Sequence, residues 1–261
     1  MNLQSFRVPE KIYCKKGCLS VALEKLKYVY HKQKVLIITS LDLQKQGRLK
    51  PMIDKLNELG IAYAIHDVNA GMTNAVKIFE PDCMLAFYEV DCDIILASKI
   101  LMAMDKKIYF IAVPCWLGTH SQVLPLGYDT NNNFADMVII DIDLMTANID
   151  SNRICWSMDS ILNIAVCACD SENATDYSDS MAIQAINLIF AYLPKFLENP
   201  VDNTALEKLE SASTMAGIAF FNANTSPKKS NHIRCAKLLG MDLEILTQKL
   251  EAVSKLYLKF N

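Results

Sequence analysis

Short apolar runs alternate with segments of helical character along the first half of this 261-residue chain, and this alternation constrains the fold more than any other feature. The runs with the length and composition of buried strands are residues 35–39, 61–65, 83–87, 108–113 and 137–140. Helical patterns lie between them at residues 51–59, 75–80 and 94–104. A further strand at residues 6–13 and a helix at 18–29 precede them. Strands that alternate with short helices predict an α/β domain with a doubly wound, mostly parallel sheet.

The second half of the chain has no strand pattern. Apolar residues recur there at helical spacing, in residues 178–196, 204–222 and 241–259. Asp176 or Ser178 can cap the first of these helices. We therefore predict two domains, an α/β domain over residues 1–150 and an all-α domain over residues 151–261.

The turn after the predicted strand at residues 83–87 lacks glycine. Only eight of the 261 residues are glycine, where roughly 7 % is usual, and the chain contains neither a G-x-G-x-x-G nor a P-loop pattern. Phosphate-binding turns between a strand and a helix normally use glycine so that backbone N–H groups can approach the phosphate. This turn has bulk and negative charge instead, in the order Tyr88, Glu89, Val90, Asp91, Cys92 and Asp93. Instead of a phosphate, the carboxylates of this turn could hold a hard cation through their oxygen atoms.

Charge, hydropathy and cysteine usage exclude several classes of protein. The formal net charge is −3 with no basic block, which argues against nucleic-acid binding. The first ten residues lack the apolar core of a leader peptide, and every apolar run is shorter than the roughly 20 residues of a membrane span. Nine cysteines without a framework spacing are typical of a reducing cytosol. We expect a cytoplasmic protein with neither nucleic-acid nor membrane partners.

Two cysteine pairs have spacings that a metal site can use. Cys14 and Cys18 form a C-x3-C pattern, and Cys167 and Cys169 form a C-x-C pattern. Neither pair has a second cluster nearby to complete a ligand set, so we interpret these cysteines as small apolar residues.

Several longer segments resemble the iron-containing alcohol dehydrogenases, and they occur in the same order as in that family. The segments are "FRVPEKIYCKKGCLSVALEKL", "KVLIITS", "PDCMLAF", "IAVPCWLGTHSQVLP", "ADMVIIDIDLM", "SDSMAIQAINLIFAYLP" and "LESASTMAGIAFFNA". The resemblance covers nearly the whole chain and is strongest to the alcohol dehydrogenase half of bifunctional aldehyde-alcohol dehydrogenases. Members of the family are considerably longer, so segments are missing from this chain.

The resemblance implies a dehydroquinate synthase-like architecture, in which a Rossmann-like domain precedes an all-helical one. The family uses NAD(P) and a divalent metal, iron or zinc. A Gly-Gly-Gly-Ser turn receives the pyrophosphate, and a second loop, Thr/Ser-Gly-Thr-Gly-Ser-Glu, adds cofactor contacts. An Asp, a His one helical turn later and two further His hold the metal, which polarises the substrate alkoxide for hydride transfer.

The family's cofactor-binding positions fall on residues with unsuitable chemistry. The acidic residue that meets the ribose falls on Ser40. The second loop becomes Leu117-Gly118-Thr119-His120-Ser121-Gln122, with one glycine of two and without the Glu. The degenerate cofactor positions are therefore Ser40, Tyr88, Glu89, Val90, Asp91, Gly118, Thr119 and Ser121.

The family's metal-binding positions are also altered. The ligands fall on Ser160, Ile164 and Lys229, and the fourth falls in a stretch that is missing after Ile233. Lys229, beside Lys228, would repel a dication. Possible substitutes are Asp159, which is one residue off its position, and His232, with His120 as a third ligand.

These positions together predict a degenerate family member, a pseudoenzyme without NAD or metal. Such a protein would act by association with itself or with a related protein, through the N-terminal strand region by which the family dimerises. One alternative is an active NAD(P)-dependent, metal-dependent alcohol dehydrogenase with a rebuilt site. Another is a sensor that binds a small ligand between its two domains.

Overall fold

The computed structural model describes residues 5–71, 73–104, 107–126, 133–145, 150–225 and 232–256. The chain divides into two compact units. The sheet unit consists of Pro9–Trp116 and Pro125–Ala147. The helical unit consists of Met1–Val8, Leu117–Leu124 and Asn148–Asn261, so it includes a loop from near the end of the first half of the chain.

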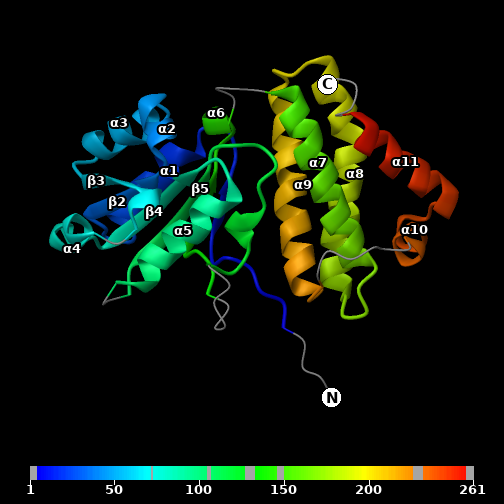
Figure 1. The fold of residues 1–261 in the computed structure, drawn as a ribbon, viewed down its shortest axis with the longest axis horizontal. Coiled ribbons are helices and arrows are strands. Elements are labelled where there is room, and N and C mark those ends of the chain that lie inside the picture. Colours follow the sequence, from blue (N-terminus) through cyan, green and yellow to red (C-terminus); the bar gives the residue numbers. More distant parts are fainter. Residues whose placement is uncertain are drawn as a thin grey trace. The chain divides into compact units, whose positions relative to one another are not determined.

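The described part of the sheet unit contains one parallel sheet of six strands in the order β1-β6-β5-β4-β2-β3 (Figure 1). The strands are β1 (Ile12–Cys14), β2 (Lys34–Thr39), β3 (Ala62–Asp67), β4 (Cys83–Tyr88), β5 (Tyr109–Pro114) and β6 (Met137–Ile140). The helices are α1 (Cys18–Tyr28), α2 (Leu41–Lys45), α3 (Lys50–Glu58), α4 (Asn74–Phe79), α5 (Asp91–Met102) and α6 (Ile142–Met145), with a 3-10 turn, η1 (Val68–Ala70). The predicted alternation of strands and helices is confirmed.

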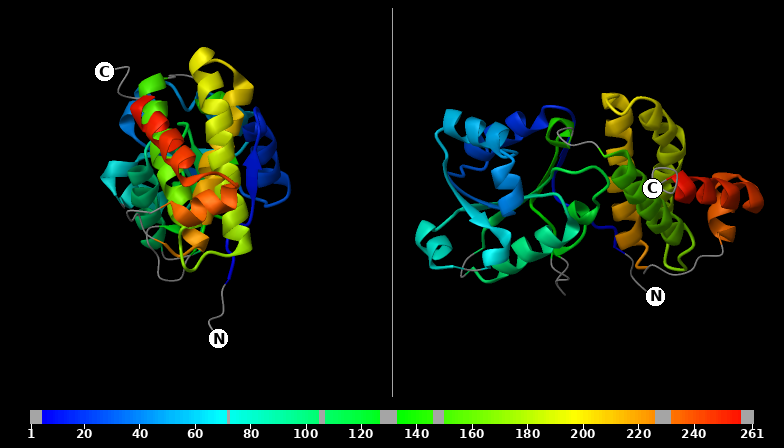
Figure 2. Two further views of the ribbon diagram at one scale, coloured as in Figure 1. Left: turned by 90° about the vertical axis from the view of Figure 1, so that its right-hand side faces the viewer. Right: turned by 45° about the horizontal axis from the view of Figure 1, so that its top comes forward.

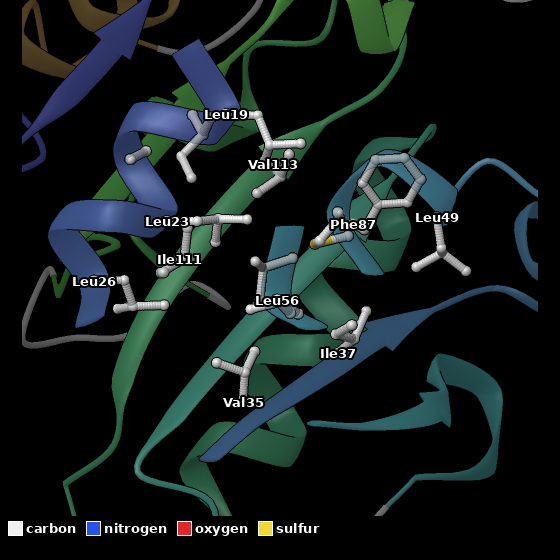
Figure 3. Packing of buried hydrophobic residues seen from close by; sticks show 14 of the residues in the cluster. Leu19, Leu23, Leu26, Val35, Ile37, Leu49, Leu56, Phe87, Ile111 and Val113 are labelled. Atoms are coloured by element: carbon white, nitrogen blue, oxygen red, sulfur yellow. The ribbon is translucent and has the colours of Figure 1, made fainter. Parts of the chain in front are cut away.

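Helices cover both faces of the sheet. Alternate residues of the strands, such as Val35, Ile37 and Phe87, pack with Leu23 of α1 and Leu56 of α3 (Figure 3). The residues between them in the strands are also buried, on the face where α5 lies against β4. Because both faces are covered, the strands are continuous apolar runs rather than alternating ones.

A buried carboxylate joins the two ends of the sheet unit. Asp141, directly after β6, is only 2 % exposed. Its Oδ1 accepts the N–H of Gly17 at 2.8 Å, and its Oδ2 accepts the N–H of Leu19 at 2.9 Å. The carboxylate thus satisfies free donors at the start of α1, beside the pairing of β1 with β6.

The helical unit is built around three long helices that run side by side (Figures 1 and 2). Its helices are α7 (Ser151–Cys169), α8 (Asp176–Glu198), α9 (Asn203–Asn222), α10 (Ile233–Leu239) and α11 (Leu243–Leu256), and the loop contributes a 3-10 turn, η2 (Ser121–Val123). By length and composition alone α8 could cross a membrane, but it packs against α7 and α9 as the core helix of a bundle does. The prediction of a helical second half is confirmed.

The predicted N-terminal strand is mostly wrong. Only Ile12–Cys14 forms a strand, because the ladder with β6 begins at the pair Ile12 and Val138. Pro9 has no N–H to donate to a sheet. The backbone of Arg7 bonds instead to the side chain of Asn222, which accepts its N–H at 2.6 Å and donates to its carbonyl at 2.8 Å.

The residue that caps α8 is also different from the one predicted. Thr175 is the N-cap, and its hydroxyl accepts the N–H of Ser178. The Ser178 hydroxyl in turn accepts the N–H of Thr175 at 2.8 Å. With Thr175 as the N-cap in this reciprocal capping box, the helix begins at Asp176. An N-cap at Asp176 would have started the helix one residue later.

Candidate functional site

The turn after β4 is short and follows a buried tyrosine. Tyr88 is the last residue of the strand, is 1 % exposed, and accepts the N–H of Cys115 at 2.8 Å through its carbonyl. Only Glu89 and Val90 separate it from Asp91, the first residue of α5. No side chain caps this helix. The turn therefore places the N-terminal end of α5 directly after a strand whose last side chain is part of the core.

Carboxylates dominate the electrostatics of this turn. Burial raises the pKa of Asp93, and the charges of Glu89 and Asp67 raise it further. Burial also raises the pKa of Cys92, with Asp93 and Asp91 adding to the effect. A further negative charge brought to the start of α5 would meet this field and would be destabilised by it.

Ser40, the residue at the ribose position, has a local structural role. It is the N-cap of α2, and its hydroxyl accepts the N–H of Leu43 at 3.4 Å. Thr39, the last residue of β2, is 1 % exposed, and its hydroxyl has no hydrogen-bond partner within the described part of the chain. The end of β2 therefore presents hydroxyls, where an acidic side chain would accept bonds from a ribose.

The loop 117–124 makes close approaches to α7 and to α9 within the helical unit. Gly118 has φ +90°, and a Cβ there would lie 2.5 Å from Cβ of Ser157 on α7. On the other side, a Cβ at Gly217 of α9 would lie 2.9 Å from Val123 and 3.1 Å from the carbonyl of His120. Glycine is required at both positions because the backbones come too close for a larger residue.

A buried carboxylate fastens the same loop to α9. Glu210 is fully buried. Its Oε1 accepts Nε2 of Gln122 at 3.2 Å, and its Oε2 accepts the N–H of Gly118 at 3.3 Å. Gln122 Nε2 also donates to the carbonyl of Thr119 at 3.0 Å. Sequence reasoning missed Glu210, although a lone acid in the small and apolar stretch of residues 209–220 is a signal that could have found it.

The other predicted residues of this loop lie beside that network. Thr119 is 5 % exposed, and its hydroxyl lacks a hydrogen-bond partner among the described residues. Ser121 begins the turn η2. The loop that resembles a cofactor-binding segment is thus bonded through Gly118 and Gln122 to Glu210 of α9 in its own unit.

The two described metal positions lie one helical turn apart on α7. Ser160 is exposed, while Ile164 is 7 % exposed and apolar. Lys229 falls outside the described residues. A hydroxyl and a hydrocarbon at these places supply none of the nitrogen, sulfur or carboxylate ligands that iron and zinc prefer.

The structure does not bring the possible substitutes together. Asp159 accepts the hydroxyl of Ser254 on α11 at 2.5 Å. The backbone N–H of His232 bonds at 2.9 Å to Asp170, which is the C-cap of α7. Asp159 and Asp170 are eleven residues apart, which is roughly 16 Å along a helix. Across the described residues, no three or more His, Cys, Asp or Glu side chains are grouped as a metal site would require.

One thiol of the C-x3-C pair is partly buried and is held by backbone carbonyls. The Cys18 thiol bonds to the carbonyls of Ile140 and Tyr13, and burial raises its pKa to about 12. A thiol with that pKa stays protonated at neutral pH, whereas metal binding requires the thiolate.

Comparison with known proteins identifies relatives of both halves. Residues 157–230 match the family model described as the Fe-containing alcohol dehydrogenase family, C-terminal. The aldehyde-alcohol dehydrogenase of Clostridium acetobutylicum is 29 % identical over 270 aligned residues, which cover 85 % of this chain and 31 % of that protein. This chain therefore spans less than a third of the length of that relative.

Solved structures share the fold across nearly the whole chain. The sulfoacetaldehyde reductase from Bifidobacterium kashiwanohense, solved in complex with NAD+, superposes with a TM-score of 0.82 at 17 % identity, over 98 % of this chain and 86 % of that one. The iron-containing alcohol dehydrogenase from Thermococcus thioreducens gives 0.80 at 20 % identity, over 97 % and 86 % of the two chains.

Proposed function

Because the chain belongs to the iron-containing alcohol dehydrogenase family, we propose that it is a member without dehydrogenase activity, which binds neither NAD(P) nor a catalytic metal and acts by protein association. The single observation that carries this proposal is the turn after β4, where Tyr88 is buried and Glu89 and Asp91 precede and begin α5.

The turn is unfavourable for a pyrophosphate for two reasons. Side chains at Glu89 and Val90 occupy the positions at which the family's glycines let backbone N–H groups approach the phosphates. Burial raises the pKa of Asp93, and the charge of Glu89 raises it further, so this turn already disfavours negative charge. A dianion would add to the negative charge that these side chains bring to the turn.

The second loop and the metal positions support the same proposal. Gly118 is required by its contact with Ser157, and its N–H is bonded to Glu210. The backbone of Gly118 is thus used for packing and hydrogen bonding within the helical unit, and its N–H is not free to bind a ligand. At the metal positions, Ser160 and Ile164 offer no strong ligand.

Association is proposed for the N-terminal region. β1 is an edge strand of the described sheet, and edge strands are where a strand from another chain can pair. Just before it, Phe6 and Val8 are 39 % and 41 % exposed although both are apolar. An edge strand that follows a sequence segment with exposed apolar side chains suits the addition of a second copy or of a relative.

Cofactor and metal binding can be tested directly on the purified chain. Titration with NADH, followed by the fluorescence of the nucleotide, should show no saturable binding, and elemental analysis should find no stoichiometric iron or zinc. The Bifidobacterium kashiwanohense sulfoacetaldehyde reductase, whose structure contains NAD+, is the positive control. Saturable micromolar NADH binding together with alcohol-dependent NADH formation would instead establish a rebuilt dehydrogenase.

The association can be tested by analytical ultracentrifugation of the chain alone and mixed with the Clostridium acetobutylicum relative. We expect a dimer or a mixed assembly. The double variant Phe6→Ser/Val8→Ser should dissociate it, while Ile78→Ser, at an 81 % exposed position on α4, should not. A monomer under both conditions at every concentration would contradict the proposed role.

A further inference from the structure

Two buried cysteines from distant parts of the sequence meet in the helical unit. Cys169 is the last residue of α7, and Cys235 lies in the first turn of α10. Both are free thiols with no exposed surface. The two thiols interact, since Cys169 raises the pKa of Cys235, and the backbone N–H of Cys235 bonds to Asp170, the residue that follows Cys169.

The backbone around the two thiols is held by bonds that do not involve sulfur. Asp170, next to Cys169, accepts the N–H of Cys235 at 2.9 Å through Oδ1 and that of His232 at 2.9 Å through Oδ2. Arg234 donates to the carbonyl of Cys169 and makes a two-pronged pair with Asp179 of α8, at 2.8 and 2.5 Å. The start of α10 is therefore docked on the end of α7 whether or not the thiols interact.

We propose that Cys169 and Cys235 are an oxidative modification site, a dithiol that closes to an intramolecular disulfide in the presence of a low-molecular-weight disulfide such as glutathione disulfide. One cysteine, as its thiolate, attacks the oxidant and forms a mixed disulfide while one glutathione leaves. The second cysteine sulfur then displaces the other glutathione. The protein loses two protons and two electrons, and the oxidant takes them up and is reduced to two glutathione thiols.

The surroundings make this closure slow but durable. The hydrogen bond with Cys169 and burial raise the pKa of Cys235, so the attacking thiolate is scarce at neutral pH. Once formed, the bond would join residues 169 and 235 and enclose α8 and α9 in one covalent loop. It would therefore respond to a sustained change in redox conditions and would tie α10 to the three-helix core.

Other cysteines in the chain are less suitable partners. Cys18 bonds to carbonyl oxygens, and Cys155 is buried on α7 more than three turns before Cys169. Cys167 is two residues from Cys169 and therefore lies on a different side of α7. The specific expectation is one linkage, between Cys169 and Cys235.

The linkage can be tested on the full folded chain. After incubation with glutathione disulfide and alkylation of the remaining thiols, proteolysis without reductant should yield a peptide that joins the segments containing Cys169 and Cys235, and dithiothreitol should release it. The variants Cys169→Ser and Cys235→Ser should lose this peptide, and Cys155→Ser should retain it.

Two results would overturn the proposal. One is that Cys169 and Cys235 remain alkylatable, or carry only glutathione, after oxidation of the folded chain. The other is that the joined peptide forms only when the oxidation is done in denaturant.

As a second measurement that does not rely on a variant folding normally, the oxidised chain should unfold at a higher urea concentration than the reduced chain. An unchanged midpoint would contradict the predicted clamp.

Discussion

The turn after β4 and the loop 117–124 are the two segments whose sequences we predict to correspond to the family's glycine-bearing cofactor segments, and they differ in how glycine is used. The first turn has no glycine and is filled by Tyr88 and carboxylates. The second retains Gly118, whose missing Cβ is needed for contact with Ser157. A glycine at a cofactor position is therefore no evidence of cofactor binding until the atoms that its Cβ would meet are known.

The strongest way to break this comparison is to replace Gly118 by alanine. Its φ of +90° strains any L-residue, and the new Cβ would collide with Ser157, so Gly118→Ala should lower the free energy of unfolding by about 3 kcal/mol. Gly47→Ala is the matched control, because Gly47 has φ +69° with nothing within 4 Å, and should cost only about 1 kcal/mol. Urea unfolding measures both. Equal losses would mean that the contact with α7 is unimportant.

A second test restores the acid of the family's loop at Gln122. Gln122→Glu places a second carboxylate next to the buried carboxylate of Glu210. It should lower the free energy of unfolding by about 2 kcal/mol at pH 8. One carboxyl of the pair would hold a proton more tightly when folded than when unfolded, so the loss should shrink as the pH falls towards 5. Urea unfolding at the two pH values measures it. The swapped variant Gln122→Glu/Glu210→Gln should recover most of the stability, and a swap as unstable as the single variant would contradict the pairing.

The smallest expected effect concerns the acidic turn. The folded state holds the proton of Asp93 more tightly than the unfolded state does, so this residue reduces stability as the pH rises above the ordinary value of 3.8. Asp93→Asn should therefore raise the free energy of unfolding at pH 7 by a few tenths of a kcal/mol, and the gain should vanish below that value. Asp42→Asn, in the first turn of α2, is the control. The same pH-dependent gain there would show that the burial of Asp93 and the charges of Glu89 and Asp67 are not its source.

The fold could be predicted from the sequence because its signals are local. A parallel sheet that is covered on both faces needs continuous apolar strands, and each of the five internal runs forms one. The N-terminal strand was overextended because its pattern does not reveal how far its partner β6 reaches. The sequence pattern predicts that the second half of the chain is helical, but it does not give the bounds of α7 and α10.

The candidate site could be predicted only in part. The residues at family positions could be assigned from sequence order, and the burial of Tyr88 agrees with its apolar context. The bonds of Glu210 to Gln122 and Gly118 could not be predicted from sequence order, because they join residues about ninety positions apart through tertiary packing. The separation of Asp159 from His232 likewise depends on where α10 docks on α7.

The bonds of Asp141 have a consequence for the order in which the chain can assemble. A ribosome makes β1 first, but β1 pairs with β6, and the start of α1 is capped by the carboxylate that follows β6. Neither partner exists until residue 141 has been synthesised. The middle strands can pair while the chain is still growing, so the edge of the sheet that is translated first is the last to be placed.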